Sequence, residues 1–335
     1  MEETITTVFS TIVPMARRKM TKAKPQKAVR TLTYTVPAGL STIDIMKDLS
    51  IVNRKLFRQG YCVGIESVEF GYTGNPASFD TLRLTAGTAG DTWSVHNAHV
   101  KGHALWNQMN QLVLEDNPSI AGKWADYKVR LDVEHQSGGT LAPLDGQGNP
   151  YLAGEWIYST YTMPQHVVNA ATGEPLPADI TTAHLLGDDL GVPGALTSIG
   201  LVKAYAESRA TVFDNNPNVP AGMSDSFFNL LTDSGSQEPE LSLEIEFQND
   251  DPPYDLLNYP GGAANAPTPI DSEFSLAPVG QPTGLLSPFV AQCGLIRLTN
   301  EAFLNGAQVT AAAMTVRVTV MAGKYKGIAA IPMGQ

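Results

Sequence analysis

The segment MTVRVTV, residues 314–320, alternates between apolar and polar side chains at every position. Its apolar members, which would share one face, are Met314, Val316, Val318 and Val320. A period of two predicts a β-strand with one face in a core and the other in water. The segments YKVRLDVE (127–134) and LSLEIEF (241–247) alternate in the same way. Strands of this kind, spread over the whole chain, predict mainly antiparallel β-structure.

Other segments are rich in β-branched and aromatic residues, which favour strands. They are residues 30–36, 62–72, 81–85, 155–162, 198–206 and 293–299. Between them we expect long loops at 136–154 and 214–225, and the region from Pro252 to Pro288 holds eight of the 23 prolines. Loops of this length in a folded domain usually cover a neighbouring subunit or display a surface.

Helical patterns are scarce. The best one covers residues 98–115, where Leu105, Met109, Leu112 and Val113 form an apolar stripe at helical spacing. A shorter helix is expected at 224–231. Neither forms a regular crossover between strands, which argues against a parallel α/β sheet. Each helix is soon followed by an alternating strand, a weak sign of internal duplication.

Length and composition limit the architecture. A chain of 335 residues exceeds the usual size of one core, so it predicts either two domains or one barrel with large insertions. With 43% hydrophobic and only 16% charged residues, the chain is expected to be ordered.

No secretory leader or membrane span is expected. Glu2 and Glu3 stand where a leader would be positively charged, and the apolar stretch at 4–15 is interrupted by Thr, Ser and Pro. Cys62 and Cys293 are too few for a disulfide framework, so we expect two buried thiols made in a reducing cytoplasm.

The sequence contains none of the common catalytic or phosphate-binding motifs, so we expect a protein that is not an enzyme and needs no cofactor. Two groups of residues are candidate metal sites. His96, His99 and His103 have a spacing that suits Zn²⁺, but they lie opposite the apolar stripe, and His96 is expected to precede the helix. We therefore favour a polar face or a subunit contact. For the acidic segment 250–255, turn chemistry explains the residues as well as a Ca²⁺ site does.

A basic run precedes the first expected strand. Residues 17–30 contain seven of the 22 Lys and Arg and no Asp or Glu: Arg17, Arg18, Lys19, Lys22, Lys24, Lys27 and Arg30. Lys47, Arg54, Lys55 and Arg58 follow, so half of all basic residues lie before residue 60. The run is either a solvated tail, an arm on nucleic-acid phosphates, or an arm on anionic lipid headgroups.

Three segments carry a resemblance to a known group of proteins. DLSIVNRKLFRQG (48–60), VHNAHVKGHALWNQMN (95–110) and KWADYKVRLDV (123–133) resemble stretches of capsid proteins from small circular single-stranded-DNA viruses. Within that group, the lipid-containing bacteriophages of the finnlakevirus type have a major capsid protein of similar size. The resemblance implies their fold, two jelly-roll barrels side by side, with a basic arm at 1–30, a first jelly roll at 31–165 and a second at 166–335.

The resemblance also implies a function. The chain would form homotrimers that act as pseudo-hexagonal tiles of an icosahedral virus shell, made in the host cytoplasm and found in the virion. Its partners would be further copies of itself, vertex or minor capsid proteins, and an internal membrane or single-stranded DNA. The basic arm would face that interior.

Other architectures and functions stay open. A single jelly roll with a projecting insertion would place most of 136–290 outside the shell. A carbohydrate-binding or glycoside-cleaving sandwich would use exposed tryptophans, among Trp93, Trp106, Trp124 and Trp156, or a pair of carboxylates. A bacterial surface-layer or pilus protein is disfavoured by the missing leader.

Overall fold

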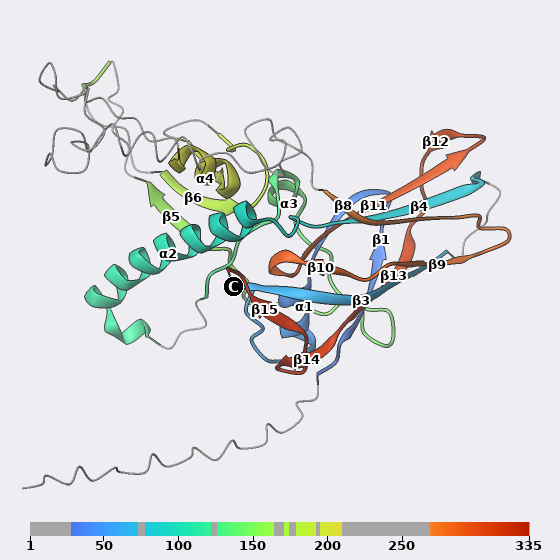
Figure 1. The fold of residues 1–335 in the computed structure, drawn as a ribbon, viewed down its shortest axis with the longest axis horizontal. Helices are drawn as coiled ribbons and strands as arrows, with labels where there is room; N and C mark the ends of the chain where they lie inside the picture. The colour runs from blue at the N-terminus through green and yellow to red at the C-terminus, as the bar shows by residue number, and fades with distance from the viewer. Residues whose placement is uncertain are drawn as a thin grey trace, which may run out of the picture.

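Two antiparallel sheets built from both ends of the chain form the larger part of the structure (Figure 1). The computed structural model describes residues 28–72, 78–121, 126–163, 171–173, 179–191, 195–209 and 269–334. Sheet A contains β1 (Thr31–Val36), β13 (Met314–Val320), β3 (Tyr61–Gly71), β9 (Thr283–Leu286), β10 (Phe289–Ala291) and β15 (Ala330–Pro332). Sheet B contains β2 (Gly39–Asp44), β11 (Leu295–Leu304), β12 (Ala307–Val309), β4 (Thr81–Gly87) and β8 (Ile270–Leu276).

The order of the long strands follows a simple rule. β9 and β10 both pair with β3 and count as one interrupted strand. Numbered along the chain, the strands then lie in the order 1-8-3-6 in sheet A and 2-7-4-5 in sheet B. The two sheets enclose one core, to which both contribute buried side chains such as Val318 of β13 and Leu298 of β11.

The alternating segment 314–320 shows why these residues form strands. Met314, Val316, Val318 and Val320 are buried in the core, while Thr315 and Arg317 are exposed. β13 lies between β1 and β3 and pairs with both along its length, so its backbone groups are satisfied on both sides. Helix α1 (Ile45–Asn53) closes one end of the sandwich and starts at Asp44, whose side chain accepts a hydrogen bond from the Lys47 amide.

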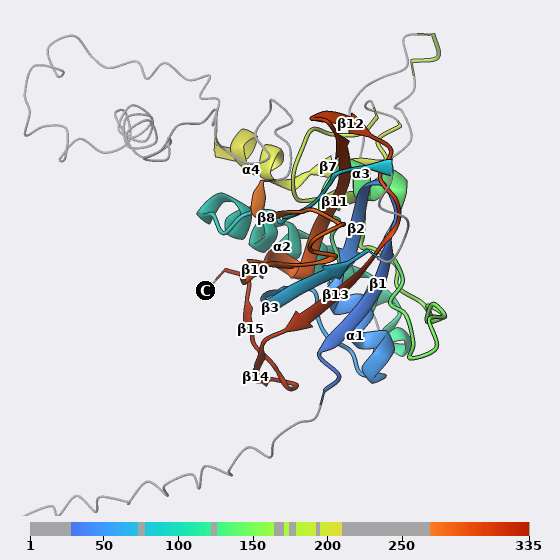
Figure 2. The ribbon, with the colours of Figure 1, turned by 90° about the vertical axis from the view of Figure 1, so that its right-hand side faces the viewer.

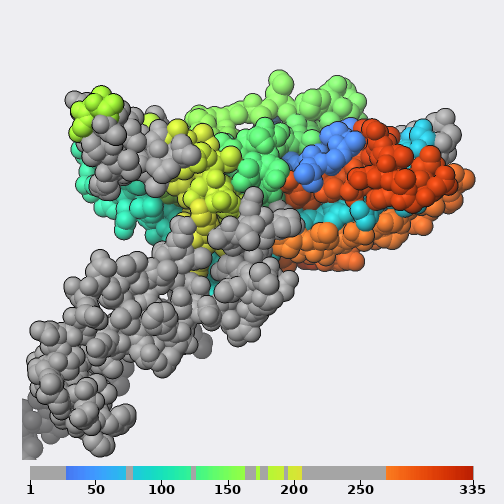
Figure 3. Space-filling view, turned by 90° about the horizontal axis from the view of Figure 1, so that it is seen from above, coloured from blue at the N-terminus to red at the C-terminus, as the bar shows by residue number. Residues whose placement is uncertain are grey.

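The chain between β4 and β8, residues 88–269, is a large insertion into the sandwich. Its described elements are α2 (Trp93–Asp116), α3 (Val133–Gly138), β5 (Thr160–Met163), β6 (Asp179–His184), β7 (Ser198–Gly200) and α4 (Leu201–Arg209). Short 3₁₀ turns occur at Pro118–Ile120 and Gln292–Gly294. Figures 1 and 3 show the described part of the insertion beside the sandwich, and in Figure 1 α2 and α4 lie at the end away from β12.

The insertion has a hydrophobic cluster of its own. Val95 and Ala98 of α2 meet Val129, Leu185 and Val202 there. Cys62, Cys293, Leu295 and Met333, which belong to the sandwich side of the chain, complete the cluster. Both cysteines are free and buried, as predicted from the sequence.

Several sequence predictions are confirmed. The structure is mostly antiparallel β, and strands occur where 30–36, 62–72, 81–85 and 314–320 predict them. The helix expected at 98–115 is α2, which is longer at both ends. The helix at 224–231, the strand at 241–247, the loop at 214–225, the acidic segment 250–255 and Trp124 lie outside the described residues.

The strand predicted at 127–134 is wrong. The segment is extended, but it makes a single bridge, from Arg130 to His184, and α3 begins at Val133. Its polar side is also covered: Lys128 and Asp132 are only 7% and 6% exposed. Lys128 lies over the ring of Trp156, with Nζ 4.9 Å from the ring centroid. The sequence does alternate, but the polar side of the segment packs against another part of the chain and does not face water as expected.

Other boundaries also differ from the prediction. The strand at 198–206 stops at Gly200, after which the chain continues as α4. The strand at 155–162 is shortened to β5, and Cys293 lies in a 3₁₀ turn before β11. The proline-rich loop predicted between 252 and 288 contains β8 and β9. Sheet pairing, which sequence pattern does not encode, decides these ends.

The apolar stripe of α2 is only partly covered. Val95, Ala98 and Gly102, on the same face of the helix, are buried, whereas Leu105 and Leu112 are 47% and 64% exposed. The histidines depart from the expected polar face. His96 lies inside α2, His99 is 2% exposed, and His103 stacks on Tyr127 with ring centroids 4.9 Å apart.

The expected division near residue 165 does not separate the two large sheets. β1 pairs with β13 and β4 pairs with β11, so each sheet takes strands from both sides of that position. In the described part of the insertion, only the three strands β5, β6 and β7 form a sheet. A second barrel therefore stays a prediction, because residues 210–268 are outside the described ranges.

Candidate anion-binding surface

The predicted arm enters the sandwich at Arg30. Arg17, Arg18, Lys19, Lys22, Lys24 and Lys27 lie outside the described residues. Arg30, just before β1, donates from Nη1 to the carbonyl oxygen of Val320 at 2.7 Å and pairs with Glu66 at 3.2 Å. Its guanidinium is held by sheet A, so Arg30 fixes the root of the arm.

A second contact holds the root of the arm against the end of α1. The amide of Val29 donates to Oδ1 of Asn53 at 2.7 Å, and Nδ2 of Asn53 donates to the carbonyl of Val29 at 3.0 Å. Nδ2 also donates to the carbonyl of Leu49 inside α1. One amide side chain thus joins the last turn of α1 to the residue that precedes Arg30. Sequence reasoning missed Asn53.

Basic residues collect at this end of the sandwich. We call Arg54, Lys55, Arg58, Lys324 and Lys326 the basic end; the first four are exposed and Lys326 is half-buried. They come from the loop after α1 and from β14 (Ala322–Tyr325) with the turn that follows it. Figures 1 and 2 both show α1, β14 and the start of β1 at the same end of the molecule.

Tyr325 joins the two segments of the basic end. Its ring stacks on Tyr61 with centroids 4.1 Å apart, and its hydroxyl accepts a hydrogen bond from the amide of Arg58 at 3.0 Å. Lys326 donates from Nζ to the carbonyl of Leu56. These contacts bring together cations that are about 270 residues apart in the chain.

Two of these cations sit at backbone positions with positive φ. Arg54 (φ 52°) ends α1, and its amide donates to the carbonyl of Ser50. Lys326 (φ 52°) and Gly327 (φ 101°) form a two-residue hairpin turn. Side chains other than Gly, Asn and Asp seldom adopt this left-handed conformation. Its use for two basic residues at one end, Arg54 exposed and Lys326 half-buried, is consistent with a surface shaped for contact.

The charges at this end act on one another. Burial lowers the pKa of Lys326, the charge of Arg58 lowers it further, Asp126 raises it and Lys55 lowers it. Asp126 also pairs with Arg58, with Nε and Oδ2 3.8 Å apart. Clustered cations repel each other, so a bound anion that neutralises them lowers their electrostatic free energy. Lysines and arginines bind phosphates in this way. The basic end is therefore a candidate anion-binding surface.

Arg54, Lys55 and Arg58 belong to the basic residues that the sequence places before residue 60, but Lys47 does not join them. Its Nζ donates to Thr140 Oγ1 at 2.5 Å, in the insertion. Lys324 and Lys326 were missed, because only the fold brings their turn to the loop after α1. The segment GKYKG (323–327), a glycine-flanked basic turn, is the signal that would have found them.

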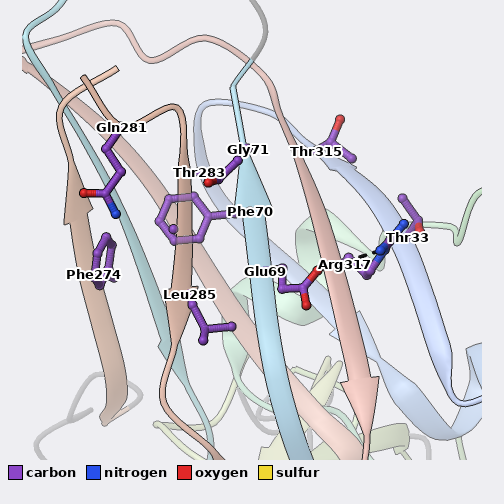
Figure 4. A pocket seen from close by; sticks show the side chains of 11 residues that line it. Thr33, Glu69, Phe70, Gly71, Phe274, Gln281, Thr283, Leu285, Thr315 and Arg317 are labelled. Atoms are coloured by element: carbon purple, nitrogen blue, oxygen red, sulfur yellow. Dashed lines mark ion pairs between the residues drawn. The ribbon is translucent and has the colours of Figure 1, made fainter. Parts of the chain in front are cut away.

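A different hollow lies on the outer face of sheet A, at the end of β9 (Figure 4). It has a volume of about 810 Å³, and its wall carries Thr33, Thr283 and Thr315. Glu69 and Arg317 pair with each other across it at 3.8 Å. Glu69 is the one carboxylate among its described lining residues, whereas glycoside cleavage needs two.

A buried polar cluster ties the insertion to α1. Asp44 accepts hydrogen bonds from Gln59 Nε2 at 3.0 Å and Trp156 Nε1 at 3.1 Å. Burial raises the pKa of Asp44 to about 6, although Lys47 and the hydrogen bonds from Trp156 and Tyr158 lower it. Burial also raises the pKa of Asp48, to about 8, although Tyr34 donates to it at 2.6 Å. These side chains are enclosed, so we assign them a structural role.

Among the described residues, neither metal-ligating side chains nor a membrane-spanning helix indicates a further site, and neither do related proteins. Within the described ranges, no three His, Cys, Asp or Glu side chains gather as a metal site requires. None of the described helices has the length and apolar character needed to cross a bilayer. Comparison of the chain with protein families, curated proteins and solved structures gave no match.

Proposed function

We propose that this chain is the major coat protein of a virus, which assembles with copies of itself into an icosahedral shell. The single observation that carries the proposal is the strand order 1-8-3-6 facing 2-7-4-5. This is the connectivity of an eight-stranded jelly roll, a fold found in viral capsids and also in lectins and cupins. Fold alone does not specify function, so the basic end must support the choice.

The basic end and the arm support the coat-protein proposal over a sugar-binding one. Coat proteins meet phosphates on the inner side of the shell, from either nucleic acid or lipid headgroups. Here the arm is rooted by Arg30 and Asn53 at the same end as Arg54, Lys55 and Lys326. The proposed inner surface is therefore the basic end together with the arm.

The insertion supports one form of coat protein in particular. It leaves the sandwich after β4 and returns at β8, as in the single jelly roll with a projecting domain. In this form the strands β5, β6 and β7 of the insertion would face the outside or the neighbouring tiles, while α2 borders the basic end. The double jelly roll is the alternative, and it needs a second set of eight strands that includes residues 210–268.

Assembly is tested on the purified full chain by analytical ultracentrifugation and negative-stain electron microscopy of the same sample. We expect trimers or closed shells of uniform diameter. Hexagonal outlines would favour two barrels for each chain, and three-lobed outlines would favour one barrel with a projection. A monomer at every salt concentration and pH would reject the coat-protein proposal.

The inner surface is tested by binding to a single-stranded oligonucleotide and to vesicles of anionic lipid over a range of salt. The test variant carries Arg54→Gln and Lys324→Gln, and the matched control, which removes the same number of charges, carries Lys101→Gln and Arg317→Gln, both outside the basic end. For nucleic acid, the slope of log affinity against log salt should fall by about 0.7 for each contact removed. Equal binding by test and control variants to both ligands would reject this surface.

A further inference from the structure

A hollow of about 770 Å³ opens between α2 and the basic end. Its lining comes from α2, from residues 58–61, from 126 and 127, and from the C-terminal residues 332–334. Arg58 belongs both to this lining and to the basic end. The volume is in the range of pockets that bury a small organic ring system.

The walls of the hollow are aromatic. His103 stacks on Tyr127 with an interplanar angle of 9°, and Trp106 lies 6.3 Å from His103 and 5.9 Å from Tyr127 between ring centroids. Tyr61, in the segment opposite α2, also lines the hollow. Trp106 and His103 are half-buried, so parts of both rings face the hollow. Such walls hold flat rings by stacking.

Polar groups with open hydrogen-bonding capacity lie among these rings. His99 lines the hollow and is 2% exposed, yet neither of its ring nitrogens has a hydrogen-bond partner in the described structure. Burial lowers the pKa of His99 to about 3, so the ring is neutral and offers one donor and one acceptor. Asn107 and Asn110, on α2, add amide groups at the mouth.

The position of the hollow indicates which class of ligand it binds. Arg58 and Lys55 lie close enough to Lys326 for their charges to lower its pKa, and Arg58 also lines the hollow. Phosphates that lie along the basic end would therefore place a neighbouring group of the same ligand in the hollow. Asp126, the one carboxylate among the described lining residues, is paired with Arg58. Single-stranded nucleic acids carry both groups: a row of phosphates and unstacked bases that stack on aromatic side chains.

We propose that this hollow binds one unpaired nucleobase of a single-stranded nucleic acid whose phosphates lie along the basic end. The base stacks against Trp106 and His103, and Asn107, Asn110 and His99 bond to its edge. The proposal rests on the proposed coat function and selects nucleic acid, over lipid, as the partner of its inner surface.

The test compares two fluorescein-labelled oligonucleotides of equal length, one with thymine bases and one with abasic sites, by fluorescence anisotropy at low salt. We expect the wild-type chain to bind the base-bearing strand roughly 5- to 100-fold more tightly. Trp106→Leu should remove this difference. Trp93→Leu is the matched control, because Trp93 is an exposed residue of the same helix outside this hollow.

A second variant guards against misfolding of Trp106→Leu. Asn107→Ala with Asn110→Ala changes only residues at the mouth and should weaken binding of the base-bearing strand while leaving the abasic strand unchanged. Equal wild-type affinity for both strands would overturn the base pocket and leave the basic end intact. Competition by neutral saccharides, with none by thymidine monophosphate, would also overturn it. Failure to bind either strand, or to assemble, would instead reject the coat function.

Discussion

The sandwich and the insertion are built on two different kinds of core. The sandwich encloses apolar side chains from facing strands, such as Val316, Val318 and Leu298, with polar residues outside. In the insertion, polar side chains are enclosed as well: Lys128 lies over Trp156, and Asp132 pairs with Arg297. Alternation therefore predicts strands well only in the sandwich, where one side of each strand meets water.

The largest expected effect comes from the ion pair that joins the two regions. Arg297 of β11 pairs with Asp132 ahead of α3, and both side chains are only 8% exposed. Arg297→Ala leaves a buried carboxylate without its cation, so the free energy of unfolding should fall by about 3–5 kcal/mol in urea titrations. Arg317→Ala breaks an exposed pair with Glu69 and should cost less than about 1 kcal/mol. Equal losses of unfolding free energy in the two variants would mean that the buried ion pair stabilises the fold no more than the exposed pair does.

The next expected effect depends on pH and concerns Asp48, a buried residue of α1. Burial raises the pKa of Asp48 to about 8 in the folded chain, above the value near 4 of an unfolded chain. The carboxyl therefore favours folding below about pH 4, and this contribution is lost as pH rises toward 8. Asp48→Asn should flatten the stability profile between pH 4 and 8 in thermal or urea unfolding.

Asp145 provides the control with the opposite sign. It is half-buried, and its pKa is lowered by hydrogen bonds from the amides of Asn149 and Gln147. Its small contribution is present at neutral pH and lost as pH falls through the acidic range. Asp145→Asn should leave the profile between pH 5 and 8 unchanged, and a profile that follows Asp48→Asn would refute our assignment.

A smaller effect tests packing inside the insertion. A methyl group at Gly102 of α2 would lie 2.8 Å from the hydroxyl of Tyr127 and 3.1 Å from Leu201. Gly102→Ala should cost about 1–3 kcal/mol by overpacking, although Ala usually favours helices over Gly. At Gly138 of α3 a methyl group meets no atom within 4 Å, so Gly138→Ala should be neutral or stabilising. Thermal unfolding that ranks the two variants in the reverse order would show that α2 is loosely packed.

The smallest effect concerns the start of α2. Thr92 accepts a hydrogen bond from the Val95 amide at 3.4 Å and caps the helix. Thr92→Ala should lower the free energy of unfolding by about 1 kcal/mol. Thr92→Ser, which keeps the cap, is the control. If only the insertion loosens, hydrogen exchange should rise in α2 and stay unchanged in β13.

Prediction from the sequence succeeded where local pattern and environment agree. The strands at 30–36 and 314–320 and the helix around 98–115 were found because each has one buried face and one that meets water. Of the candidate site, the sequence supplied the arm and three cations of the basic end. It did not supply Lys324 or Lys326, because their role depends on a strand from the far end of the chain. It did not supply Asn53 either, because that role depends on a tertiary contact with Val29.

The sequence by itself determined the β-rich class of the fold, the long helix, the two buried thiols and the basic start of the chain. These follow from side-chain period and composition, which act locally. The tertiary structure alone decided that β1 pairs with β13, that a large insertion separates β4 from β8, and that the basic turn at 323–327 meets the loop after α1. Pairing between distant strands depends on shared burial and hydrogen bonds, and neither is encoded in any single segment.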